Sequence, residues 1–232
     1  MTKKTIIILI MSFAVFVLIM TESNNNFIPE KTKYKLDSIK SPDAKSLDYI
    51  TEEYRMIIDK DLNDTLVYLP QTMIKNKPDG ILGNYMTEIC LQKYIDSLGG
   101  VDFCILNNGG IRSSLDKGYL IKKDIFRLMP FDNELVIVEL QISDFYNLID
   151  FLETRQEPIS GLNIPNYDTA LKQKTIFRIL TSDYLANGGG GMTFLHNKKT
   201  IKTGEKLRDL IINYMQDIEC DTIKYTNKAR YE

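Results

Sequence analysis

The sequence has 232 residues, of which 44% are hydrophobic and 26% are charged. This composition is typical of a globular protein with enough chain for one substantial core. The 29 lysines and arginines are balanced by 31 aspartates and glutamates, which leaves a net charge of −2. Nucleic-acid binding draws on an excess of positive charge, so this balance excludes that class of partner from our expectations.

The first 26 residues have the pattern of a targeting segment. Two lysines precede residues 6–20, a run of 15 residues that is apolar apart from one serine. This length suits the apolar core of a signal peptide and is short for a membrane span. We therefore predict a signal peptide over residues 1–26 or, if it is not cleaved, a membrane anchor through residues 5–20. In either case we expect an exported protein. It would be periplasmic, or it would be anchored in the membrane and face the periplasm or the exterior.

Cysteine and histidine are sparse. Cys90 and Cys104 lie in apolar runs typical of small core residues, and Cys220 adds no disulfide or metal-binding pattern, although one disulfide is an open alternative. His196 is the only histidine, and its polar neighbours indicate a solvated loop. A centre with two catalytic metal ions needs several His and Asp ligands, so we expect no metal or other cofactor in this chain.

The expected helices and strands mingle along the chain without a steady βαβ period. In chain order they are a helix over 47–61, a strand over 65–69, a helix from Asp79 to residue 98 that ends at Gly99-Gly100, strands over 101–106, 119–121 and 135–142, a helix capped by Ser143, a strand over 175–181 and a last helix capped by Thr203. This mixture predicts an α+β fold, with a mixed β-sheet and packed helices. We expect one domain over residues 27–222, beginning with a linker, and a polar tail over residues 223–232 that frays.

Two glycine-containing segments carry the candidate binding residues. The apolar strand before Asn107 breaks into Asn108, Gly109 and Gly110 and then reaches Arg112. Paired glycines permit a sharp turn and a close approach of the backbone to a ligand. The planar guanidinium of an arginine suits a phosphate or a carboxylate. The second segment, residues 183–189, reads Asp-Tyr-Leu-Ala-Asn-Gly-Gly.

Together with two further blocks, these segments resemble the C-terminal, substrate-binding domain of the 5′-nucleotidase and UDP-sugar hydrolase family. The four blocks are Leu-Gly-Asn at residues 82–84, Asn-x-Gly-Gly-Ile-Arg at 107–112, Pro-Phe-x-Asn at 130–133, and the Asp-aromatic-Leu-Ala-x-Gly-Gly loop at 183–189. They occur in the family's order and span about 110 of the 232 residues. The resemblance implies the fold of that domain.

The resemblance also implies a nucleotide or nucleoside ligand. Phe131 and Tyr184 would be the two rings that sandwich the base, and Arg112, with Asn107 beside it, would hold phosphate. The implied substrate-binding residues are Asn107, Gly109, Gly110, Arg112, Phe131, Asn133, Tyr184 and Gly190. No catalytic residue is implied, because the family's N-terminal domain carries two metal ions and performs the hydrolysis.

Two positions depart from the family pattern. Gly190 stands where the family has an aspartate that binds the ribose hydroxyls, and Lys75 or Lys77 stands near the place of a phosphate-binding arginine. A lysine supplies charge there but no bidentate fork. Both sugar recognition and phosphate recognition are therefore altered relative to the family.

These observations favour the nucleotide-binding half of a split 5′-nucleotidase. It would act in nucleotide hydrolysis with a separate metallophosphoesterase chain that holds the divalent metal ions. The alternative is a non-catalytic module that binds a nucleotide or another ligand at a degenerate site. A self-sufficient hydrolase that uses aspartates, glutamates and magnesium is a third reading, and no carboxylate cluster in the sequence supports it.

Overall fold

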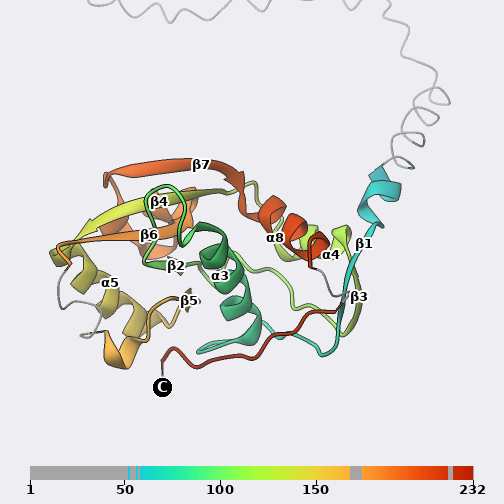
Figure 1. Cartoon of the computed structure of the whole chain (residues 1–232), viewed down its shortest axis with the longest axis horizontal. Coiled ribbons are helices and arrows are strands. Elements are labelled where there is room, and N and C mark those ends of the chain that lie inside the picture. Colours follow the sequence, from blue (N-terminus) through green and yellow to red (C-terminus); the bar gives the residue numbers. More distant parts are fainter. Residues whose placement is uncertain (1–51, 53–55, 57, 168–173, 219–221, 232) are drawn as a thin grey trace, which may run out of the picture. The chain divides into compact units, whose positions relative to one another are not determined.

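The computed structural model describes residues 52, 56, 58–167, 174–218 and 222–231 (Figure 1). They belong to a compact unit that spans Glu52–Glu232. The predicted targeting segment, the linker at the start of the domain and most of the helix expected over residues 47–61 lie outside the described residues. No helix in the described part is long and apolar enough to cross a membrane.

A mixed sheet of five strands lies at the centre of this unit (Figure 1). The strands are β2 (Phe103–Ile105), β4 (Glu134–Gln141), β5 (Ile159–Ser160), β6 (Ile176–Ser182) and β7 (Thr200–Lys206). Their order is β5-β2-β6-β4-β7, with β2 and β6 parallel and the other three pairs antiparallel. The mixed pairing confirms the predicted fold class.

A two-stranded antiparallel ribbon and several helices complete the unit. The ribbon pairs β1 (Thr65–Leu69) with β3 (Gly118–Ile121). The helices are α3 (Ile81–Tyr94), α4 (Lys122–Leu128), α5 (Ile142–Arg155), α7 (Asp183–Ala186) and α8 (Leu207–Gln216), with short 3₁₀ turns η1 (Ile164–Asn166), η2 (Gly189–Gly191) and η3 (Thr193–Leu195).

The sheet is buried on both faces. Successive side chains of a strand point to opposite faces, so Leu135 and Ile137 of β4 join one apolar cluster and Val136 and Val138 join the other. The first cluster contains buried residues of α3, α4 and α8, and the second contains those of α5 and α7. Helices on both faces explain why β4 reads as a continuous apolar run.

The predicted apolar faces of two helices are confirmed, whereas the predicted helix starts are not. The buried residues of α3 include Leu82, Tyr85, Met86 and Ile89, and those of α5 are Phe145, Leu148, Ile149 and Leu152. Gly80 precedes α3 in place of Asp79, and Gln141 precedes α5, so Ser143 lies inside the helix. Helix α3 ends at Tyr94, several residues before Gly99-Gly100.

Strand β7 replaces the helix start expected at Thr203. The Thr203 hydroxyl donates to the Leu135 carbonyl at 2.7 Å, and α8 begins only at Leu207. Residues 200–206 alternate between exposed and half-buried positions. A polar strand at the edge of a sheet lacks the alternation of apolar and polar residues by which a strand is predicted. The sequence therefore does not predict β7.

The C-terminal segment does not fray as predicted. Residues 222–231 are tied to the start of α3, where the Asp79 carboxylate accepts hydrogen bonds from the backbone amides of Arg230 and Tyr231 at 2.6 and 3.0 Å. The buried guanidinium of Arg230 pairs with Glu88 at 2.9 Å. The polar residues of this segment therefore form hydrogen bonds and ion pairs with residues that are far away in the sequence.

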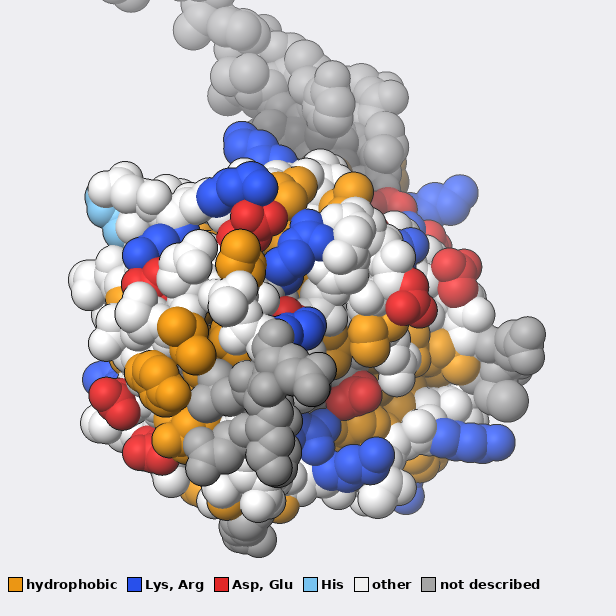
Figure 2. Space-filling view, turned by 60° about the vertical axis from the view of Figure 1, so that its left-hand side comes forward, with side chains coloured by type: hydrophobic (Ala, Val, Ile, Leu, Met, Phe, Trp, Pro, Cys, Tyr) orange, Lys and Arg blue, Asp and Glu red, His pale blue; other side chains and the backbone are white. Residues whose placement is uncertain are grey.

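The surface shown in Figure 2 carries basic and acidic side chains side by side. Several of these charges are paired, as in the contacts of Lys122 with Asp61 and Asp64 at 2.7 and 3.1 Å. This mixture agrees with the near-neutral composition.

Candidate binding site

A cavity of about 590 Å³ contains every binding residue that the sequence predicts. We call it the Arg112 cavity. Its lining residues are Lys75, Lys77, Asn107, Asn108, Gly109, Gly110, Arg112, Phe131, Asn133, Arg155, Glu157, Tyr184 and Gly190. The predicted residues come from three loops that are separated in sequence, and the ends of β2, α4 and β6 bring these loops together. Their roles as ligand contacts stay a prediction.

The turn after β2 folds tightly around the side chain of Asn107. The Gly110 amide donates to the Asn107 carbonyl at 2.9 Å. A Cβ atom at Gly110 would lie 2.9 Å from the Asn107 side-chain oxygen, and one at Gly109 would lie 3.2 Å from its nitrogen. The two glycines therefore allow the asparagine side chain to lie against the turn, which is the close approach that the sequence predicts.

Arg112 presents its charge to this cavity. Its guanidinium carbon lies 5.9 Å from the centre of the Phe131 ring, and Nη1 donates to the Gly109 carbonyl at 3.3 Å. The side chain is exposed, and the structure gives it no ion pair with any described carboxylate. A guanidinium with unused donors beside an aromatic face can bind an anionic group of an aromatic ligand.

Helix α8 anchors the loop that carries Phe131 and Asn133. The buried guanidinium of Arg208 donates to the Met129 carbonyl at 3.3 Å and also to Asp132. Hydrogen bonds from Lys206 and Arg208 hold the pKa of the Asp132 carboxyl below its usual range. These contacts leave the Phe131 ring 44% exposed at the cavity.

The glycine loop positions Tyr184 in the lining of the Arg112 cavity. The Tyr184 hydroxyl accepts from the Gly190 amide at 3.0 Å, and the ring is 50% exposed. A Cβ atom at Gly189 would lie 2.5–2.6 Å from two ring atoms of Tyr184, so the ring needs a glycine beneath it. Phe131 and Tyr184 thus line one cavity, and their role as a pair of rings around a base stays a prediction.

Gly190 itself has a left-handed backbone, with φ of +63°. A Cβ atom there would lie 3.1 Å from a methyl carbon of Leu185 and 3.9 Å from the Asn107 Cβ atom. A side chain at this position would therefore enter near the Asn107 turn. Aspartate tolerates the left-handed region better than most residues, so the conformation is open to the carboxylate that the family has at this position.

Sequence reasoning missed three lining residues, which are Asn108, Arg155 and Glu157. Glu157 is buried and pairs with Lys77 at 2.6 Å, so the charge of Lys77 is already neutralised. Lys75 lines the cavity as well. The sequence gives no signal for this turn, because α5 ends at Arg155 and the next residue, Gln156, adopts a left-handed conformation that no glycine marks.

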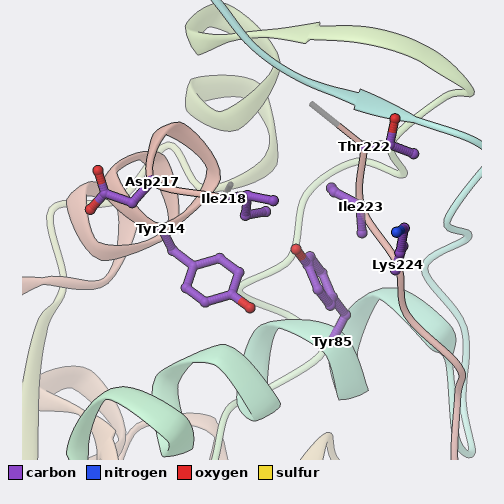
Figure 3. Close-up of a pocket in the computed structure, with 7 residues that line it drawn as sticks. All are labelled: Tyr85, Tyr214, Asp217, Ile218, Thr222, Ile223 and Lys224. Atoms are coloured by element: carbon purple, nitrogen blue, oxygen red, sulfur yellow. The ribbon is translucent and has the colours of Figure 1, made fainter. Parts of the chain in front are cut away.

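A second cavity of about 410 Å³ lies between α3, α8 and residues 222–224 (Figure 3). The side chains of Tyr85, from α3, and Tyr214, from α8, extend into it, and Ile218 and Ile223 add apolar walls (Figure 3). Burial raises the pKa of the Tyr85 hydroxyl, which has no hydrogen-bond partner among the described residues. None of the predicted binding residues lines this cavity, so the Arg112 cavity is the candidate site.

The predicted cysteine and histidine environments agree with the structure. Cys90 and Cys104 are buried free thiols, and burial beside Cys90 raises the pKa of the Cys104 thiol. His196 is exposed. Cys220 lies outside the described residues. Within the described ranges, no group of three or more His, Cys, Asp or Glu residues is placed to hold a metal ion.

Part of the chain matches one protein family. Residues 68–154 match the family profile described as 5′-nucleotidase, C-terminal domain. An apyrase of Tabanus yao is 27% identical over 173 residues, which cover 57% of this chain and 31% of the apyrase. The cell wall protein Lmo0130 of Listeria monocytogenes is 24% identical over 233 residues, covering 78% of this chain and 30% of that protein. The chain thus spans under a third of these two relatives.

A solved structure shows the same fold. The 5′-nucleotidase precursor from Thermus thermophilus superimposes with a TM-score of 0.64 at 18% identity. The superposition covers 82% of this chain and 43% of the Thermus chain. At this level of identity the match establishes the fold.

Proposed function

We propose that this chain, which is 5′-nucleotidase C-terminal domain-like in sequence over residues 68–154 and in fold, is the nucleotide-binding half of a split 5′-nucleotidase. The Arg112 cavity binds the nucleotide. A separate metallophosphoesterase chain would hold the divalent metal ions, which would supply the chemistry of phosphoester hydrolysis. This chain supplies the positioning of the substrate.

The observation that carries the proposal is the convergence of all eight predicted residues on one cavity. Phe131 and Tyr184 offer aromatic faces on which a base can stack, and each such contact contributes roughly 1–3 kcal/mol. Arg112 offers a charged fork for phosphate. The volume of about 590 Å³ falls within the range of small-molecule sites.

The division of labour follows from the residues present. The 232 residues include one histidine, His196, which lies apart from the Arg112 cavity lining. A pair of catalytic metal ions needs several imidazole and carboxylate ligands. In the proposal these ligands belong to the partner chain, and the residues described above bind the base and the phosphate.

Export is part of the proposal. The basic and then apolar start of the chain supports a signal peptide or an uncleaved anchor through residues 5–20. One relative is described as a cell wall protein. We place the chain in the periplasm or at the outer side of the membrane, where nucleotides from outside the cell would be hydrolysed.

Gly190 favours a second candidate function, a non-catalytic module that binds a nucleotide or another ligand. The Arg112 cavity has one carboxylate among its lining residues, Glu157, and that carboxylate already accepts from Lys77 and from the Asn108 amide. A ribose therefore finds no unused carboxylate in this lining. Such a site would bind a ligand through its aromatic and cationic groups alone.

Calorimetry of the purified chain with AMP and with adenosine tests the proposal. We expect AMP to bind more tightly than adenosine, and we expect Arg112→Met to remove that difference because it removes the phosphate contact. Arg127→Met, at an exposed arginine outside the Arg112 cavity lining, is the matched control and should change neither affinity. Absence of binding by both ligands would contradict the proposal.

The two candidate functions separate in a second experiment. A split enzyme predicts that a metallophosphoesterase co-purifies with this chain and that the pair hydrolyses AMP faster than the metallophosphoesterase alone. A binding module predicts AMP or adenosine binding with no such partner and no gain in rate.

A further inference from the structure

Glu157 is a buried carboxylate in the wall of the Arg112 cavity. Its residue is 4% exposed, and it follows Gln156, whose left-handed backbone turns the chain at the end of α5. A carboxylate is rarely buried to this extent unless other groups satisfy its charge and its oxygen atoms. The contacts of Glu157 therefore indicate what it does.

Both carboxylate oxygens of Glu157 accept short hydrogen bonds from other segments. Oε1 accepts from the Lys77 ammonium at 2.6 Å, and Oε2 accepts from the Asn108 backbone amide at 2.6 Å. The same ammonium donates to the Arg155 carbonyl at 2.8 Å. The Glu157 carbonyl accepts from the Tyr231 hydroxyl. One residue thus joins the segment before α3, the turn after β2 and the C-terminal segment.

The bond to Asn108 acts directly on the turn that holds the predicted ligand contacts. Asn108 lies between Asn107 and Gly109, and the Gly109 carbonyl accepts from Arg112. An amide bonded to a carboxylate is held more firmly than one bonded to a neutral acceptor. Fixing the Asn108 amide therefore fixes the shape of the turn and, through Gly109, one contact of the Arg112 side chain.

We infer that Glu157 is a positioning residue of the Arg112 cavity, which holds the Asn107–Gly110 turn in its ligand-binding shape and neutralises Lys77. The cations of the lining that have no such partner are then Lys75, Arg112 and Arg155, as far as the described residues show. The inference rests on the proposed function where it concerns nucleotide affinity, and on the structure alone where it concerns the turn.

Three variants test this role. Glu157→Leu removes both acceptors, Glu157→Gln keeps one acceptor oxygen without the charge, and Glu153→Gln on the exposed side of α5 is the matched control. Amide hydrogen exchange at Asn108, followed by NMR, measures the turn, and calorimetry measures AMP affinity. We expect Glu157→Leu to speed exchange about tenfold and to weaken AMP binding about tenfold, from the loss of a hydrogen bond to a charged group.

The glutamine variant distinguishes positioning from contact with the ligand. Its oxygen can still accept from Asn108, so we expect exchange near that of the parent. We expect AMP affinity that is equal or higher, because Lys77 loses its counter-charge. Equal weakening of AMP binding in both Glu157 variants, with unchanged exchange at Asn108, would overturn the inference. So would a leucine variant that changes neither quantity.

If Glu157→Leu fails to fold, Glu157→Ala takes its place, since it also removes both acceptor oxygens. Unchanged exchange at Asn108 in that variant would overturn the inference. If the parent chain binds no AMP, the proposed function fails, while exchange at Asn108 in the variants still decides whether Glu157 positions the turn.

Discussion

At the scale of single residues, Gly190 is the position where one side chain changes the chemistry of the Arg112 cavity. Gly190→Asp would introduce a carboxylate near the Asn107 turn, where it can accept from the hydroxyls of a ribose. We expect about tenfold tighter binding of adenosine, which corresponds to ~1.4 kcal/mol, as measured by calorimetry. Because Gly190 has a left-handed backbone, with φ of +63°, we expect the aspartate variant to be about 1 kcal/mol less stable than the parent.

Gly204→Asp is the control for this substitution. Gly204 also has a left-handed backbone, with φ of +76°, and a Cβ atom there meets nothing within 4 Å. It lies in β7, outside the Arg112 cavity lining. The control should reproduce the loss of stability without the gain in affinity. If Gly190→Asp folds and leaves adenosine affinity unchanged, the loop does not face a ribose.

Gly189 tests whether the Tyr184 ring is a ligand contact. An alanine there would place its Cβ atom 2.5 Å from both a ring carbon and the carbonyl oxygen of Tyr184, so the ring must move. We expect weaker adenosine binding from Gly189→Ala, together with a loss of about 1–3 kcal/mol in the free energy of unfolding. Tyr184→Leu should weaken adenosine binding to a similar extent. Unchanged affinity in both variants would show that the ring does not stack on the ligand.

At the scale of elements, the start of α3 and the C-terminal segment form one hydrogen-bonded unit. The Asp79 carboxylate accepts from the backbone amides of Arg230 and Tyr231 and from the Asn84 side chain at 3.2 Å. Asp79→Ala leaves the backbone amides of Arg230 and Tyr231 without their acceptor, whereas the Asn84 side chain keeps Asn227 and the Lys228 carbonyl. We expect the free energy of unfolding to fall by about 2–3 kcal/mol in urea titrations, because hydrogen bonds to a charged group are lost.

Limited proteolysis identifies the element that Asp79 anchors. In the Asp79→Ala variant we expect faster cleavage within residues 222–231 than in the parent. Asp96→Ala, at an exposed aspartate beyond the end of α3, should change neither stability nor cleavage. Parent-like cleavage of the Asp79 variant would mean that other contacts, such as that of Arg230 with Glu88, hold the segment alone.

At the scale of the whole molecule, the proposal separates binding from hydrolysis. We expect the purified chain to leave AMP unhydrolysed with Mn²⁺, Mg²⁺ or Zn²⁺, since a pair of metal ions needs more imidazole than the single histidine supplies. Phosphate release is the measurement, and addition of a metallophosphoesterase partner should restore it. Hydrolysis of AMP by a preparation of this chain that contains no contaminating enzyme would contradict the split-enzyme proposal.

The sequence by itself determined the apolar strands, the buried faces of α3 and α5, the family resemblance and eight of the residues that line the Arg112 cavity. These features are local, because a strand, a helix face or a glycine turn shows in the residues next to one another. The start of β1 at Thr65 and its end at Leu69 are therefore predicted correctly.

Only the tertiary structure decided the partners of polar residues. Asp79 reads as a helix cap in sequence, yet its carboxylate binds a segment about 150 positions away. Thr203 also reads as a cap, yet it lies in an edge strand. Glu157 has no signal in the sequence and is a buried acceptor of the Asn108 amide in the Asn107–Gly110 turn. A polar side chain finds its hydrogen-bond partner through the packing of distant segments, and no local pattern of residues records that choice.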